Sequence, residues 1–195
     1  MKKLIYGMAI TAAAFAFQGC NSQNKDAKGM ADSMNLAKDT TTNVKATGGI
    51  AVPEGDAKFA TSAAVGGMAE VAMAKLALEK STNAKIKAFA TMMVTDHGKA
   101  NEELMVIAKT KNITLPTMVD ADHQKKMDEL AKKSGMDFDK EYVETMVDGH
   151  KSALKLMQDE AKDGMDPELK VFAGKTVPVV DGHLKAITAI HDSMK

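Results

Sequence analysis

From Asp56 to the C-terminus, the sequence carries a helical pattern that leaves no room for a β-sheet. Ala, Met, Lys, Glu and Leu dominate, apolar side chains recur every three or four positions, and no stretch alternates apolar and polar residues as a strand does. The pattern predicts four long helices and a shorter one, over residues 56–80, 84–111, 137–162 and 167–195 and over residues 119–133. We therefore expect an all-α protein.

The lengths of the connections predict how these helices are arranged. Residues 81–83 and 163–166 are short turns, so each should join two antiparallel helices. Residues 112–136, which include the short helix, are long enough to cross from one end of a bundle to the other. One such crossover is typical of ferritin-like bundles. We predict a ferritin-like four-helix bundle with a short extra helix in the crossover between the second and third long helices; a simple up-and-down bundle with an inserted helix is the alternative.

The N-terminus has the three parts of a secretory signal. A pair of lysines precedes the apolar residues 4–17, and small residues then lead to Gly19-Cys20. The apolar run is shorter than the roughly 20 residues that a membrane-spanning helix needs, so cleavage is the better interpretation. Cys20 is the only cysteine of the chain and stands where a bacterial lipoprotein carries its lipid. We predict a lipoprotein signal peptide over residues 1–19, a lipid anchor at Cys20, and a place in the cell envelope, at the outer membrane and facing the periplasm or the surface.

Residues 20–54 are rich in Asn, Ser, Thr, Asp, Lys and Gly and show no sustained periodicity. A segment of this composition cannot bury a core, so we predict a flexible tether there and a bundle domain over residues 55–195. The 26 basic residues, all of them lysine, balance 26 acidic ones. A nearly neutral chain without arginine argues against nucleic acid as a partner, which leaves the membrane, contacted through Cys20, as the predicted one.

Three of the long helices share the motif Val-x-x-His-x-x-Ala, centred on His97, His150 and His183. Positions three and four apart lie on the same helix face, so each imidazole should point into the core. The first long helix has no histidine, and Glu70 is the one acid on its apolar stripe. A glycine lies within three residues of each of these four positions, which predicts close backbone approach or access for solvent.

Two residues of an antiparallel helix pair lie at the same depth when the turn falls midway between them. The first turn is midway between Glu70 and His97, and the second is midway between His150 and His183. The four side chains should therefore form one layer. Imidazoles and a carboxylate suit a single divalent transition metal, Zn, Fe, Mn, Ni or Cu, or another small ligand. The same layer could instead be structural, fixing the register of the helices and binding nothing.

Three aspartates lie one or two residues before the histidines, at Asp96, Asp148 and Asp181. They could orient a neighbouring imidazole from behind, or they could simply be solvated. The chain has no Gly-rich phosphate loop and no nucleophile elbow, so we predict no catalytic residue and leave enzymatic activity open.

The order of several motifs resembles a bacterial family known as domain-of-unknown-function family 4142, whose members are described as exported or outer-membrane proteins. The resemblance spans residues 55–192 and rests on residues 67–71 (Gly-Met-Ala-Glu-Val), 93–97 (Met-Val-Thr-Asp-His) and 146–150 (Met-Val-Asp-Gly-His), among others. It implies a ferritin-like fold and an exported location, and no established reaction. Di-iron ferritin-like bundles carry Glu three residues before the ligating His, whereas this chain has Val94, Val147 and Val180 there, which argues against di-iron chemistry.

These observations support two functions. The first is an exported, lipid-anchored bundle that binds a transition metal or a small ligand at the Glu70, His97, His150 and His183 layer. The second is a non-catalytic envelope interaction or stress-protection module whose polar layer is purely structural.

Overall fold

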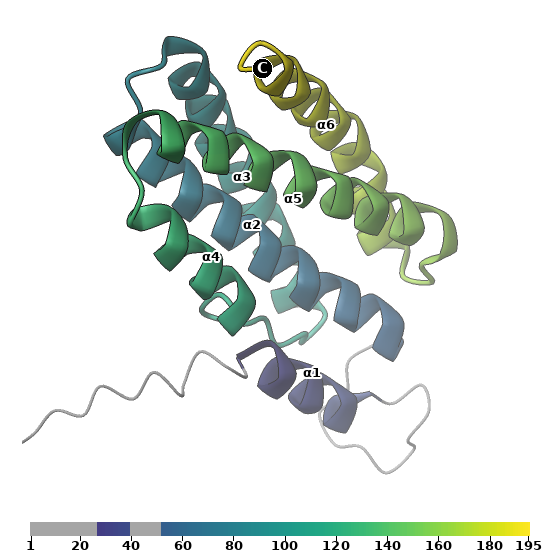
Figure 1. Cartoon of the computed structure of the whole chain (residues 1–195). Helices are drawn as coiled ribbons and strands as arrows, with labels where there is room; N and C mark the ends of the chain where they lie inside the picture. Colours follow the sequence, from purple (N-terminus) through teal and green to yellow (C-terminus); the bar gives the residue numbers. More distant parts are fainter. Residues whose placement is uncertain (1–26, 40–51) are drawn as a thin grey trace, which may run out of the picture.

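The computed structural model describes residues 27–39 and 52–195, and every element within them is a helix. The four long helices are α2 (Glu54–Lys80), α3 (Ala84–Thr110), α5 (Gly135–Asp163) and α6 (Pro167–Asp192), with α1 (Ala27–Lys38) and α4 (Ala121–Ala131) packed on the outside (Figure 1). The predicted all-α bundle is thus confirmed. No helix in the described ranges has the length and apolar content to span a membrane. The predicted signal peptide and Cys20 lie outside the described residues.

Contacts at the two ends of the bundle establish its topology. At the C-terminal end of α2, Lys80 donates hydrogen bonds to the backbone carbonyls of Ala131 and Lys133, just before α5 begins. At the N-terminal end of α2, Asp56 accepts a hydrogen bond from the backbone N–H of Met165, just after α5 ends. Helix α5 therefore runs antiparallel to α2, and the connection that carries α4 crosses the length of the bundle. This is the ferritin-like arrangement, and it excludes the simple up-and-down alternative.

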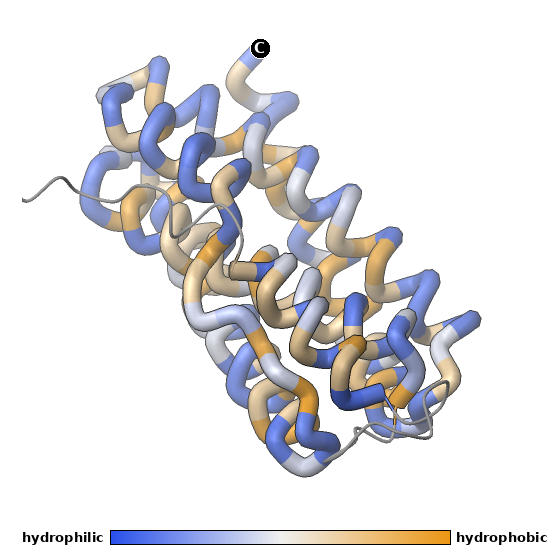
Figure 2. The backbone as a smooth tube through the Cα atoms, turned by 90° about the horizontal axis from the view of Figure 1, so that it is seen from below, coloured by the Kyte–Doolittle hydropathy of each residue, from blue (hydrophilic) through white to orange (hydrophobic). Residues whose placement is uncertain are grey.

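The apolar core has two parts, one toward each end of the bundle. One cluster gathers around Phe89 and Tyr142, and the other around Leu104 and Phe172. Polar and charged residues follow the outside of the helices (Figure 2). The middle of each long helix, where the sequence predicts a polar layer, lies between the two clusters.

Helix α1 lies in the segment that we predicted to be a flexible tether, so that prediction is wrong for residues 27–38. Thr61 of α2 donates a hydrogen bond to the Asp32 carboxylate over 2.5 Å. The side chain of Asn35, only 2% exposed, pairs with the backbone of Thr114, accepting from its N–H at 2.7 Å and donating to its C=O at 2.9 Å. These contacts that dock α1 are polar and are made with α2 and with the loop after α3. Hydrophobic periodicity within residues 27–38 therefore cannot predict them.

The start of α2 also differs from the prediction, in which this helix begins at Asp56. Helix α2 begins two residues earlier, after Pro53, and Asp56 lies in its first turn. Its carboxylate instead accepts hydrogen bonds from the backbone N–H groups of Met165 and Asp166, in the turn between α5 and α6. The Asp56 carboxylate thus stabilises the turn between α5 and α6 and does not cap its own helix.

Glu160 lies beside this turn, 7% exposed, with its Oε1 atom lacking a hydrogen-bond partner among the described residues. Burial, together with the negative charges of Asp56 and Asp166, raises the pKa of Glu160 to about 7. The turn thus holds a carboxyl group that is protonated over a wide part of the acidic range.

Candidate metal centre

The four predicted layer residues converge, one from each long helix. Glu70 comes from α2, His97 from α3, His150 from α5 and His183 from α6, and their exposures are 6%, 8%, 0% and 2%. The three imidazole rings lie 5.2 to 5.6 Å apart, centroid to centroid. The motif and the depth argument therefore identified side chains that meet in the middle of the bundle.

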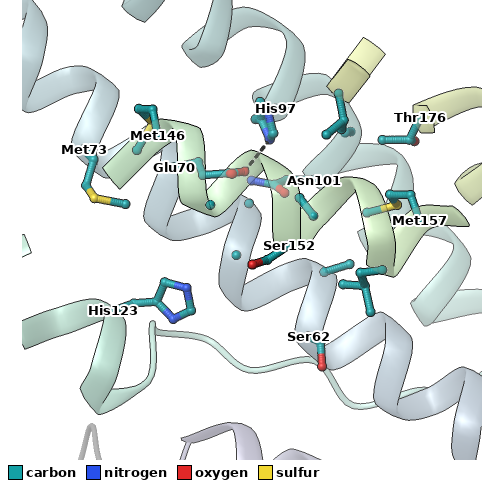
Figure 3. A pocket seen from close by; sticks show the side chains of 18 of the residues that line it. Ser62, Glu70, Met73, His97, Asn101, His123, Met146, Ser152, Met157 and Thr176 are labelled. Carbon is teal, nitrogen blue, oxygen red and sulfur yellow. Dashed lines mark ion pairs between the residues drawn. The ribbon is translucent and has the colours of Figure 1, made fainter. Parts of the chain in front are cut away.

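In each imidazole, one ring nitrogen faces a carboxylate or carbonyl oxygen. The Nδ1 atom of His97 lies 2.9 Å from a Glu70 oxygen, an ion pair marked in Figure 3. The Nδ1 atom of His150 lies 2.7 Å from the backbone carbonyl of Met146, and the Nε2 atom of His183 lies 3.0 Å from the Asp96 carboxylate. Carboxylate and carbonyl oxygens only accept hydrogen bonds, so each of these nitrogens carries the proton and donates it.

The second nitrogen of each ring is therefore left with a lone pair. The Nε2 atom of His97 faces the Nδ1 atom of His183 over 3.2 Å, so two acceptors confront one another. The Nε2 atom of His150 is buried and has no hydrogen-bond partner among the described residues. Each imidazole offers one nitrogen to a group of three that lie within 4.8 Å of one another. A buried acceptor without a donor costs about 1–3 kcal/mol, which a bound cation would offset.

The protonation states favour a cation at this point. Burial lowers the pKa of His150 and of His183, although Glu70 and Asp96 respectively oppose the effect, so these imidazoles are neutral, as metal ligands must be. For Glu70, burial works to raise the pKa, but the hydrogen bond from His97 and the three imidazoles together hold it below its usual value. The layer therefore holds one buried carboxylate together with the neutral imidazoles of His150 and His183.

The spacing of the nitrogens fits one metal ion. Bonds of about 2.0–2.1 Å from a transition metal to imidazole put neighbouring nitrogens roughly 3.3–3.6 Å apart in tetrahedral or trigonal geometry. One pair is already at 3.2 Å, and the third nitrogen, within 4.8 Å, needs a shift of about 1 Å, within the reach of a side-chain rotation. Three protein ligands leave a coordination position for water or another small molecule.

The sequence profile of DUF4142, a domain of unknown function, matches residues 39–190. The chain belongs to this family. Among solved structures, a DUF305 fragment from Deinococcus radiodurans is similar to this DUF4142 chain at 11% identity, with a TM-score of 0.65, covering 73% of this chain and 98% of that one. CopM in its Cu(I)-bound form aligns at 17% identity with a TM-score of 0.61, covering 71% of this chain and 96% of CopM. CopM in its Cu(II)-bound form aligns at 18% identity with a TM-score of 0.62, covering 72% of this chain and 97% of CopM. No curated protein matches the sequence.

These distant likenesses establish the shared helical fold alone. In this DUF4142 chain, one of the four predicted layer residues, Glu70, takes a different position from the one expected. Glu70 lies in the layer, but its oxygens are 2.9 and 3.7 Å from the Nδ1 atoms of His97 and His150, which are the nitrogens that carry protons. It therefore holds the imidazoles from behind and does not join the group of three nitrogens.

The three aspartates of the DUF4142 chain also separate. Asp96 orients an imidazole, but that of His183 on another helix and not its neighbour His97. The side chain of Asp148 is 80% exposed and lies near Lys151, and that of Asp181 is 40% exposed and pairs with Lys185. Neither of these two touches an imidazole, so one aspartate of the three contacts an imidazole, and it is not the neighbouring one.

Sequence reasoning missed two parts of the surroundings of the imidazoles. Phe89, on the same stripe as His97, places its ring edge-on to His150 and His183, with centroids 5.9 and 6.3 Å away, and shields the layer from one apolar cluster. The backbone carbonyl of Met146, four residues before His150, fixes the tautomer of that imidazole. The position of Phe89 on the apolar stripe of α3 could have predicted the aromatic contact. The four-residue spacing between Met146 and His150 could have predicted the contact with the carbonyl, because such residues are neighbours on a helix.

The glycines near the layer do not all serve close approach. A Cβ atom at Gly67 would lie 2.1 Å from the Oδ1 atom of Asn101, so this glycine lets an α3 side chain pack against α2. A Cβ atom at Gly149 would lie 3.5 Å from Glu70, an ordinary contact, and at Gly98 and Gly182 it would meet nothing within 4 Å. Close approach is therefore seen at Gly67 only, and there a side chain makes it and not the backbone of a neighbouring helix.

Proposed function

We propose that this DUF4142 protein binds one divalent transition-metal ion through His97, His150 and His183. The observation that carries the proposal is the convergence of three buried imidazoles whose N–H groups all point outward, to Glu70, to the Met146 carbonyl and to Asp96. Metal-binding histidines are commonly held in this way, with the second ring nitrogen bonded to a carboxylate or a backbone carbonyl.

Copper is the first ion to test. Imidazole ligands suit Zn, Cu, Fe and Ni, and among divalent ions Cu(II) binds a given nitrogen site most tightly. CopM, which has this fold, was solved with Cu(I) and with Cu(II), which adds support from the fold. Zn(II), Ni(II), Mn(II) and Fe(II) are the comparison ions.

A structural role for the polar layer is the second candidate, and one observation favours it. Glu70, His97, His183 and Asp96 form a continuous chain of contacts of 2.9, 3.2 and 3.0 Å. A single extra proton between the two imidazoles would satisfy this chain without a metal. It would leave the buried Nε2 atom of His150 without a partner, however, so the metal accounts for more of the layer.

The test is metal binding by the processed chain, purified without a histidine tag and stripped with a chelator. We expect one Cu(II) per chain by calorimetry and elemental analysis, and stabilisation of about 2.7 kcal/mol when free metal is 100 times the dissociation constant. That corresponds to a rise in melting temperature of roughly 5–11 °C. His150→Ala and His97→Ala should abolish this rise, whereas His191→Ala, at a partly exposed position near the C-terminus, should not.

The two candidates give opposite results. If the layer is structural, none of the ions binds stoichiometrically, and the alanine variants lose stability equally with and without metal. Stoichiometric binding that survives both His97→Ala and His150→Ala would place the metal elsewhere and refute this site.

We also propose that the protein works in the cell envelope, held by a lipid on Cys20. The support is the sequence alone: a lysine pair, a short apolar run, and a single cysteine where cleavage should fall. Mass spectrometry of the N-terminal peptide tests it. An acylated Cys20 in the membrane fraction, lost in Cys20→Ala, is the expected result, and an unmodified cysteine in a soluble fraction would contradict the proposal.

A further inference from the structure

A cavity of about 520 Å³ leads from the surface to the polar layer. At its inner end lie Glu70 and His97, and at its outer end lie Asp122 and His123, at the start of α4, and Asp148 of α5. In Figure 3, Glu70, His97 and Asn101 lie toward one side of the cavity and His123 and Ser62 toward the other. The cavity thus extends from the buried side chains of the layer to exposed residues of α4 and α5.

The walls leave this passage open because small residues line it where the helices come together. Gly66 and Gly67 of α2 and Gly149 of α5 have no side chains to fill it. A Cβ atom at Gly149 would already contact the Oε1 atom of Glu70, at 3.5 Å, so a longer side chain there would extend toward the polar layer. Gly149, which does not serve close packing, therefore helps to keep the layer accessible.

The charge of the lining is strongly one-sided. Four carboxylates line the cavity, those of Glu70, Asp120, Asp122 and Asp148, against the single ammonium of Lys126. With histidines neutral this is a net charge of −3 in the lining of a chain whose total charge is zero. A concave surface of one charge sign raises the local concentration of the opposite ion and increases its association rate by about 10- to 1000-fold.

Oxygen atoms continue along the path between rim and layer. Asn101 lies over Gly67, and Ser152 lines the cavity on α5, where its hydroxyl donates to the backbone carbonyl of Asp148 and keeps its lone pairs free to accept. Such oxygens can replace part of the water shell of a metal cation as it moves inward. At the inner end, Glu70 offers a buried carboxylate next to His97.

We propose that this cavity is the entry path for the metal ion, and that the acidic rim at Asp120, Asp122 and Asp148 draws the hydrated cation in before the imidazoles bind it. The inference rests on the proposed function. It assigns to Asp148 a role in delivery, and it gives α4 a function beyond spanning the crossover, because the N-terminal turn of α4 supplies most of the rim.

The test is the rate of metal association with the processed chain, with Co(II) as the probe because its visible absorption reports coordination by imidazole. In Asp122→Lys/Asp148→Lys we expect the association rate to fall at least tenfold at low ionic strength and to lose most of its salt dependence. The stoichiometry and the final spectrum should not change. Asp159→Lys/Asp163→Lys is the matched control, because it makes the same charge change at two exposed positions of α5 outside the cavity, and it should retain more of the rate.

A second variant tests the path by its width. Ser152 lines the cavity and is exposed, so Ser152→Trp should fold normally and slow both association and release while leaving their ratio nearly unchanged. Equal association rates in the rim variant and in its control would overturn the entry path while leaving the metal site intact. No coordination of Co(II) by the parent chain would instead overturn the site, and the path with it.

Discussion

Replacing Glu160 by glutamine should stabilise the protein at neutral pH and remove a pH dependence from its folding. Glu160 is 7% exposed, its Oε1 atom has no hydrogen-bond partner in the described part of the chain, and Asp56 and Asp166 lie close enough to repel its charge. Glutamine keeps the size of the side chain and stays neutral, so it leaves the turn between α5 and α6 without the cost of a buried charge.

The magnitude follows from the pKa. A carboxyl whose pKa rises from 4.5 to about 7 on folding is protonated in the folded protein over a pH range in which it is ionised in the unfolded chain. The unfolded state then binds fewer protons, so the free energy of unfolding falls as pH increases through this window and levels off above it. At 1.36 kcal/mol for each pH unit, the total loss is about 3 kcal/mol. Glu160→Gln should be close to the parent at pH 4.5 and more stable by about 3 kcal/mol at pH 8.

Urea unfolding followed by far-ultraviolet circular dichroism, at pH 4.5, 6, 7 and 8 and with a chelator present, measures this difference. The buried imidazoles also titrate, but they are common to both proteins and cancel when the two unfolding free energies are subtracted. Glu144→Gln, at an exposed position of the same helix, is the control and should show a difference that hardly changes with pH. A parallel pH dependence for Glu160→Gln and the parent would refute the reasoning.

Three further changes have defined outcomes. In Gly67→Ala the new Cβ would lie 2.1 Å from Asn101 Oδ1, the end of a flexible side chain that has to rotate away, and this offsets the gain of up to about 1 kcal/mol that Ala brings to a helix interior. The substitution should therefore stabilise an Asn101→Ala background more than it stabilises the parent; thermal melts of the four proteins decide, and equal changes in both backgrounds would contradict the clash. Asn35→Ala should speed amide hydrogen exchange in α1 without changing global stability, and unaltered exchange would show that other contacts hold this helix. Asp96→Asn should weaken the proposed metal binding about 10- to 100-fold in a chelator competition, because Asp96 accepts the hydrogen bond that orients His183. Unchanged affinity would show that Asp96 does not orient His183.

The sequence predicts the layer well because helices convert sequence distance into depth at a constant rate. Since α-helices rise a fixed distance per residue, a turn midway between Glu70 and His97 must bring them level, and the same holds for His150 and His183. The three- and four-residue spacing of apolar neighbours then points each side chain inward. No knowledge of side-chain conformation is needed for either step.

The roles within the layer could not be predicted in the same way, because they depend on which helix lies beside which. Asp96 lies beside the apolar stripe of α3, and it contacts His183 because α6 packs against α3. Glu70 reaches His97 and His150 through their protonated nitrogens, a matter of rotamers that spacing does not specify. Asp56 lies where a helix cap is expected, yet its partners are about 110 residues away in the chain, so local rules assign it to the wrong helix.

The docking of α1 changes how far the bundle could travel from a membrane. A tether running from Cys20 to residue 54 would let the bundle range roughly 110–120 Å from its lipid, at about 3.3–3.6 Å per extended residue. Helix α1 begins at Ala27, seven residues after Cys20, and is fastened to α2 and to the loop after α3. A lipid on Cys20 would then be at most about 25 Å from the start of this helix. Such an anchor would keep the bundle against the bilayer, so that a partner would have to meet it at the membrane surface and could not be reached across the periplasm.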